Sequence, residues 1–91
     1  MTNTEKLAAL KIDLGLTTEA YDTRLLSYLD ASAQELALEG VTLSDESLAD
    51  CNLQIMYAAW MWRRRDSGEG IPRMIRWQIN NRLFDMKTAG E

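Results

Sequence analysis

Residues 55–65 read Ile55-Met56-Tyr57-Ala58-Ala59-Trp60-Met61-Trp62-Arg63-Arg64-Arg65. Two of the three tryptophans and two of the five methionines lie in the first eight positions, and three arginines follow directly. A helical projection places half of these eight residues on one face, namely Ile55, Ala58, Ala59 and Trp62, and the rest around the remainder of the helix. A helix that is apolar nearly all round must be buried on several sides, so this segment predicts a central helix with cover on more than one face.

Composition places the chain among ordinary globular proteins and excludes several kinds of site. Its 91 residues, 46% hydrophobic and 26% charged, fit one domain with a modest core. It has no histidine and one cysteine, which excludes an internal disulfide, the usual zinc ligand sets and histidine-assisted nucleophilic catalysis. Cys51 is expected to be a buried core thiol. The sequence shows neither a secretory leader nor an apolar run of about 18 residues, so a cytoplasmic protein is the default expectation.

The net charge of −4 is unevenly distributed along the chain. Residues 1–60 contain ten acidic and three basic residues, giving −7, whereas residues 61–91 contain four acidic and seven basic residues, giving +3. A polarised molecule of this kind favours an oriented partner or self-association over general binding to a polyanion.

Cap residues and glycines predict four helices and no sheet. The first is capped by Asn3 or Thr4 and stops at Gly15, and the second is capped by Thr18 and runs to Glu39 with a left-handed Gly40 after it. The third begins at Ser44 and ends at the arginines 63–65, and the fourth starts at Pro72 and ends before a tail over residues 88–91. Residues 66–70 form an acidic, glycine-containing loop. The expected fold is one all-α domain over 1–91, a small four-helix bundle with a short N-terminal helix, two long helices and a C-terminal helix.

Apolar residues repeat at helical spacing in every segment and predict which faces are buried. The predicted buried positions are Leu7, Leu10 and Leu14 in the first helix; Tyr21, Leu25, Tyr28, Leu29 and Leu36 in the second; Leu48, Cys51, Ile55, Ala58, Ala59 and Trp62 in the third; and Met74, Ile75, Ile79 and Leu83 in the fourth. Trp77 and Phe84 flank the last of these faces. A surplus apolar face remains around Tyr57, Trp60 and Met61, which predicts that the 55–62 run is part core and part interface.

No combination of side chains indicates catalysis. The carboxylate pair Asp45 and Glu46 lies where a helix N-terminus favours negative charge. The Gly68-Glu69-Gly70 segment lacks the preceding strand and the lysine of a phosphate-binding loop. We therefore expect no enzyme activity, no metal and no cofactor.

The basic residues of the C-terminal third admit two interpretations. Seven of them flank or follow the loop, namely Arg63, Arg64, Arg65, Arg73, Arg76, Arg82 and Lys87, with Trp77 among them. Arginines beside an aromatic ring could bind phosphate and stack on bases. The favoured interpretation is that they stabilise the end of the third helix, pair with the acidic N-terminal half or serve a protein interface, because the loop is acidic and the pI is about 4.7. Whether Asn80-Asn81-Arg82 bonds to another segment or forms a solvated face stays open at this point.

Several segments, taken in order, resemble one family. They are Leu10-Lys11-Ile12-Asp13-Leu14-Gly15-Leu16, Tyr21-Asp22-Thr23-Arg24-Leu25-Leu26, Glu39-Gly40-Val41-Thr42-Leu43, Met56 to Arg65, Ile71-Pro72-Arg73-Met74-Ile75-Arg76-Trp77 and Asn80-Asn81-Arg82-Leu83. Together they resemble the small helical class of tailed-phage head–tail connector (adaptor) proteins. They are packing and loop signatures rather than catalytic residues, and they cover nearly the whole chain. The stretch after Leu83 is shorter than the family's pattern, so the extent of a C-terminal portal-binding arm is not implied by the resemblance.

The resemblance implies a structural, non-enzymatic role. Members of the family form rings, usually twelvefold, on the portal, where they extend the DNA channel and receive the next neck protein. It implies as partners further copies of the chain, the portal, and a stopper or tail-completion protein, with DNA only as channel cargo and no membrane. The implied location is the virion neck, and the host cytoplasm during assembly. The implied subunit or portal interface is Tyr57, Trp60, Met61, Arg63, Arg64, Arg65, Arg73, Arg76, Trp77, Asn81 and Arg82.

Two other functions remain as alternatives. One is a small helical DNA-binding regulator that uses the arginines around the 66–72 loop. The other is an accessory subunit of an enzyme that binds its partner through the tryptophan-rich helix. A heterologous ring needs two different complementary faces on each protomer, and the opposite charges of the two parts of this chain would orient such a contact.

Overall fold

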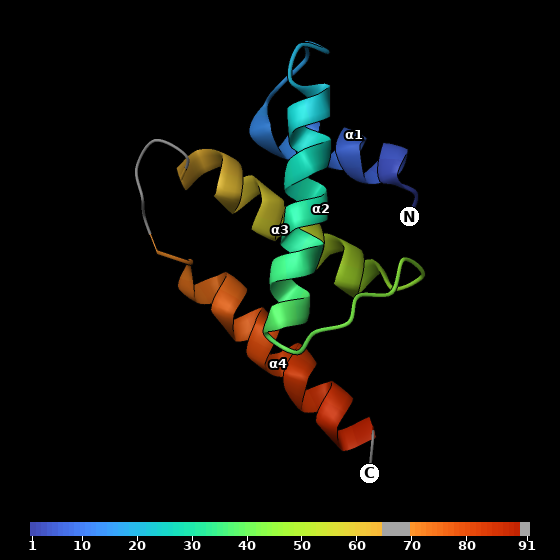
Figure 1. Ribbon diagram of the computed structural model, residues 1–91, viewed down its shortest axis with the longest axis vertical. Helices are drawn as coiled ribbons and strands as arrows, with labels where there is room; N and C mark the ends of the chain where they lie inside the picture. The colour runs from blue at the N-terminus through green and yellow to red at the C-terminus, as the bar shows by residue number, and fades with distance from the viewer. Residues whose placement is uncertain (65–69, 90–91) are drawn as a thin grey trace.

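The computed structural model describes residues 1–64 and 70–89, and side chains within these ranges as far as residue 86. Four helices make up the described part of the chain, which contains no strand: α1 (Asn3–Leu14), α2 (Asp22–Leu38), α3 (Leu48–Arg64) and α4 (Arg73–Ala89). The predicted all-α fold is therefore confirmed. In Figure 1, α3 crosses behind α2, α1 lies beside the upper half of the molecule, and the C-terminal end of α4 reaches away from the other helices.

Helix α1 is capped by Thr2 rather than by the predicted Asn3 or Thr4. The Glu5 amide donates to the Thr2 hydroxyl (3.2 Å) and the Thr2 amide donates to the Glu5 carboxylate (2.9 Å), which forms a capping box. These bonds lower the pKa of Glu5. At the other end Gly15 adopts a left-handed conformation (φ 70°), so the predicted stop is confirmed.

The predicted starts of α2 and α3 were several residues too early. The Thr18 hydroxyl accepts from the Ala20 amide in a separate turn, and α2 begins at Asp22. Ser47, not Ser44, opens α3, because its hydroxyl accepts from the Asp50 amide (3.3 Å) and its carbonyl accepts from the Cys51 amide (3.0 Å). Asp45 and Glu46 precede the helix instead of forming its first turn.

Two further boundary predictions are wrong by smaller margins. Pro72 lies just before α4, where its carbonyl accepts from the Arg76 amide (3.1 Å), rather than at the first helical position. The helix then continues to Ala89, past the predicted start of a tail at Thr88. The predicted loop over 66–69 and the end of the tail lie outside the described residues.

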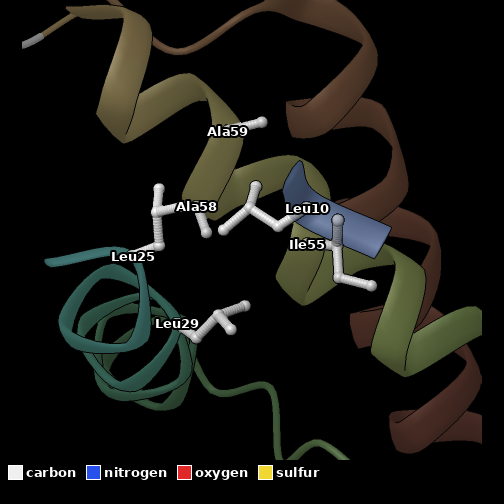
Figure 2. Packing of buried hydrophobic residues seen from close by; sticks show 6 residues of the cluster. All are labelled: Leu10, Leu25, Leu29, Ile55, Ala58 and Ala59. Atoms are coloured by element: carbon white, nitrogen blue, oxygen red, sulfur yellow. The ribbon is translucent and has the colours of Figure 1, made fainter. Parts of the chain in front are cut away.

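The first core lies where α1, α2 and α3 meet. Figure 2 shows Leu10 of α1, Leu25 and Leu29 of α2, and Ile55, Ala58 and Ala59 of α3 directed toward one another. Trp62 closes the outer end of this core, where its ring meets the edges of Tyr21 (5.3 Å between centroids) and Tyr28 (6.1 Å). The predicted inner face of α3 from Cys51 to Trp62 is thus confirmed. Leu48 is the exception, since it is 68% exposed at the helix start.

The second core lies on the opposite side of α3 and contains the residues predicted to form its surplus face. Its buried members are Leu36, Val41, Leu53, Tyr57, Ile75 and Ile79, with Trp60, Met61, Leu43 and Leu83 packed against them. Tyr57 is only 7% exposed. The prediction of an uncovered face at Tyr57 is wrong, because α4 of the same chain covers it.

Candidate interaction surfaces

Trp60 contacts the second core, the Gly70 backbone and the last residue of α3. Its indole N–H donates to the Gly70 carbonyl (3.0 Å), and its ring meets Tyr57 edge to face with centroids 5.3 Å apart. The Arg64 guanidinium lies 4.6 Å from the centre of the same ring, a cation–π distance. Trp60 and Met61 are both half-buried by these surroundings. Of the three residues predicted as surplus apolar surface, none is fully exposed.

Burial also changes the acid–base behaviour of Tyr57. Loss of hydration raises the pKa of its phenol, and the nearby carboxylates of Glu35 and Glu39 raise it further. The neutral phenol is therefore the form that suits the folded chain, as expected for a core residue.

The arginines at the end of α3 remain on the surface. Arg63 and Arg64 are exposed, and Arg63 donates to the Asp13 carbonyl of α1 (3.3 Å). Because this partner is a backbone carbonyl, the charge of Arg63 is not neutralised by it. Arg65, the third predicted arginine, lies outside the described residues.

Two arginines of α4 are used inside the chain. Arg82 binds both carboxylate oxygens of Asp50 (2.6 and 3.1 Å), and Asp50 is 1% exposed. The same carboxylate accepts from the Ser44 amide (2.9 Å), and the contact with Asp50 raises the pKa of Arg82. Arg76 pairs with Glu39 at the end of α2 (2.7 Å).

These pairs settle the alternative that the sequence left open at residues 80–82. Arg82 bonds to another segment of the chain, while Asn80 and Asn81 are exposed. Arg76 and Arg82 thus pair α4 with the end of α2 and with α3 inside the chain.

The outward side of α4 carries a row of exposed apolar residues. Met74, Trp77 and Phe84 are 64%, 63% and 68% exposed, and with Asn81 they follow the 3–4–3 spacing of one helix face. Arg73 is exposed at the start of this row. We call Met74, Trp77, Asn81 and Phe84 the outer α4 face. The prediction for Met74 was wrong, since it belongs to this face and not to the core.

A groove runs along α3 between α1 and α4. One hollow of 460 Å³ is lined by Met56, Ala59 and Trp60 of α3, Asp13 of α1, Met74 and Ile75 of α4, and Pro72, with Arg63 and Arg64 at its mouth. A second, of 390 Å³, shares Asp13 and Met56 with it. A third hollow of 420 Å³ is lined by Arg73, Met74, Trp77 and Gln78, so Met74 connects the groove to the outer α4 face.

No group of three or more potential metal-ligating side chains occurs among the residues that the structure describes. Cys51 is buried and directs its thiol toward the Ser44 and Asp45 carbonyls, which agrees with the predicted core thiol. Within the described ranges, no helix is long and apolar enough to cross a membrane.

Sequence reasoning identified Trp77, Arg73, Arg63, Arg64 and Asn81 among the surface residues but missed Met74, Phe84 and the groove residue Met56. For Met74 and Phe84, the helical spacing of residues 74, 77, 81 and 84 already indicated a shared face. That spacing could not be separated from a buried stripe, because the opposite side of α4 is apolar as well. No protein-family model matches this chain, and no curated protein or solved structure is detectably similar to it.

Proposed function

We propose that this protein is a structural head–tail adaptor of a tailed bacteriophage or prophage. In this role it forms a ring on the portal, extends the DNA channel and receives the next neck protein, without catalysis and without a cofactor. It acts in the virion neck after assembly in the host cytoplasm. Two features support this role. The segments within residues 10–83 resemble the connector family, and charge is distributed unequally between residues 1–60 and 61–91.

The outer α4 face is the observation that carries the proposal. Met74, Trp77 and Phe84 belong to neither core and are exposed on one face of α4. Contiguous exposed apolar residues on a folded chain mark a surface for protein contact. Exposed Arg73, with Arg63 and Arg64 around Met74, adds charge that orients such a contact.

Light scattering on the chain, a candidate portal and their mixture tests the adaptor role. We expect the mixture to contain a complex with about twelve chains per portal ring, as in closed cyclic assemblies. Trp77→Ala should reduce the bound fraction, whereas Leu38→Ala, which truncates an exposed leucine on α2, should not. A chain that stays strictly monomeric with and without the portal contradicts the proposal.

The DNA-binding regulator is supported less well. That function relies on the arginines around the 66–72 loop, but Arg76 and Arg82 are paired with Glu39 and Asp50. Arg64 lies on the Trp60 ring. The cations left for phosphate are fewer than the sequence alone indicates, and the rest of the chain is acidic.

A further inference from the structure

One continuous surface joins the groove on α3 to the outer α4 face. Met74 lines both the hollow that contains Met56 and Trp60 and the hollow that contains Trp77, so the two hollows adjoin at this residue. Three exposed arginines border it: Arg63 and Arg64 on one side and Arg73 on the other. We call this surface, Met56, Met74 and Trp77 with Arg63, Arg64 and Arg73, the arginine-rimmed patch.

The charge of the patch is opposite to that of the molecule as a whole. Among the described residues that line the two hollows, three are arginines and one, Asp13, is acidic, whereas the chain carries a net charge of −4. Arg63 bonds to the Asp13 carbonyl rather than to its carboxylate. Arg64 interacts with an aromatic ring. Both contacts orient the guanidinium groups without cancelling their charge, so an acidic partner gains favourable electrostatics here.

The secondary structure around the patch determines what form the partner can take. The patch lies mostly on helices, whose backbone groups are bonded within the helix except for the first N–H groups of α4 and the last C=O groups of α3, so it offers no open sheet edge to an extended strand. Its contacts are therefore made mainly by side chains. The outer α4 face spans about 15 Å from Met74 to Phe84, the length of about three helical turns. Methionines at positions 56 and 74 adapt readily to the shape of an inserted apolar side chain.

From these observations we infer that the arginine-rimmed patch binds an amphipathic α-helix of a partner protein, with an apolar side on Met56, Met74 and Trp77 and acidic residues against Arg63, Arg64 and Arg73. The inference rests on the proposed adaptor function, because it describes the segment through which another neck protein would bind the adaptor. A second copy of this chain does not supply that helix. The exposed residues in the middle of its acidic α2 are polar (Ser27, Asp30 and Gln34), and its exposed Leu26 and Leu38 are twelve positions apart and form no apolar row. Its own outer α4 face would bring Arg73 against a basic patch.

Fluorescence anisotropy with two designed, labelled helices of about 20 residues tests the inference on the full chain. One peptide carries leucines on one face and glutamates on the flanks, and the other has lysine in place of every glutamate. We expect the glutamate peptide to bind with a Kd of about 10 μM and the lysine peptide at least about tenfold more weakly. Trp77→Ala should weaken binding of the glutamate peptide about tenfold. Arg73→Glu should weaken the glutamate peptide and strengthen the lysine peptide.

Matched variants separate the patch from general effects. Leu38→Ala and Arg24→Glu alter an exposed leucine and an exposed arginine of α2, and they should leave the affinity unchanged. Circular dichroism of each variant checks that the helices persist. The inference is overturned if neither peptide binds, if both bind equally, if Arg24→Glu has the effect of Arg73→Glu, or if short duplex DNA binds the patch in place of the glutamate peptide.

The outcome is independent of the test of the adaptor function. Peptide binding without association with a portal would retain the patch and reject the adaptor role. Association with a portal without peptide binding would retain the adaptor role and reject the patch.

Discussion

At the scale of single residues, the buried carboxylate of Asp50 is the most consequential polar group in the chain. It accepts two bonds from Arg82 of α4 and one from the Ser44 amide, and so connects α4 to the link between α2 and α3. Bonds to a charged group are about twice as strong as neutral ones, and an unpaired buried charge is costly. Asp50 therefore fixes the register of α4 on α3.

Replacing Arg82 tests this role. We expect Arg82→Leu to lower the free energy of unfolding by about 3 kcal/mol, because the Asp50 carboxylate stays buried without its cation. Adding Asp50→Asn should recover part of the loss, since the amide oxygen can still accept from Ser44 and no charge remains. The measurement is urea unfolding followed by circular dichroism. Arg76→Leu is the control: its pair with Glu39 is 42% and 31% exposed, so the cost should stay below about 1 kcal/mol.

Asp45 gives the chain a component of stability that depends on pH. Its carboxylate accepts from the buried Lys6 ammonium (2.6 Å), and this bond holds the pKa of Asp45 below its ordinary value. A lowered folded-state pKa stabilises the protein above about pH 4, and the contribution disappears as the pH falls through the folded pKa. Asp45→Asn should therefore reduce the melting temperature at pH 7, and the difference from the wild type should shrink toward pH 3.

Asp30→Asn, at an exposed position of α2, provides the comparison for Asp45→Asn. It should leave the melting temperature close to that of the wild type at both pH values. A difference between wild type and Asp45→Asn that stays constant from pH 7 to pH 3 would show that the carboxylate charge is not the cause.

At the scale of elements, substitutions on the buried and the exposed side of α4 should have different consequences for stability. Ile79 is fully buried in the second core, whereas Trp77, two residues earlier, is 63% exposed. Ile79→Ala should cost about 3 kcal/mol of unfolding free energy through lost burial and a cavity. Trp77→Ala should change it by less than about 0.5 kcal/mol, even though it removes the larger side chain. Chemical denaturation measures both, and a large cost for Trp77→Ala would mean that this ring is covered within the monomer.

The helices themselves could be predicted from local sequence, but their starts and the orientation of α4 could not. Ser44 and Ser47 are both followed by acidic residues, so either can cap a helix by local rules. In the structure Ser47 caps α3, while Asp45 precedes the helix and binds Lys6, 39 positions earlier in the chain. For α4, apolar residues occur on both sides of the helix, and the partner surface on α3 decides which side is buried.

At the scale of the whole molecule, the pairing of charges leads us to expect weak DNA binding from a chain with seven basic residues in its last third. Arg76 and Arg82 bind acidic residues of the first 60 positions, and those positions carry a charge of −7. The exposed arginines Arg63, Arg64 and Arg73 surround an apolar groove rather than a flat basic face. A phosphate backbone would meet few cations and a net repulsive field.

This distribution predicts no retardation of a duplex of about 30 base pairs at about 10 μM protein and about 150 mM salt, where basic DNA-binding domains still bind through counterion release. A gel-shift titration between about 50 and 200 mM salt measures it. Arg82→Leu combined with Asp50→Asn adds no exposed cation and should not change the result, whereas Asp13→Lys, which makes the groove wall basic, should produce weak, salt-sensitive binding. Tight binding by the wild type that falls steeply with salt would instead favour the DNA-binding regulator, because it would mean that the exposed arginines act together on phosphate despite the acidic remainder of the chain.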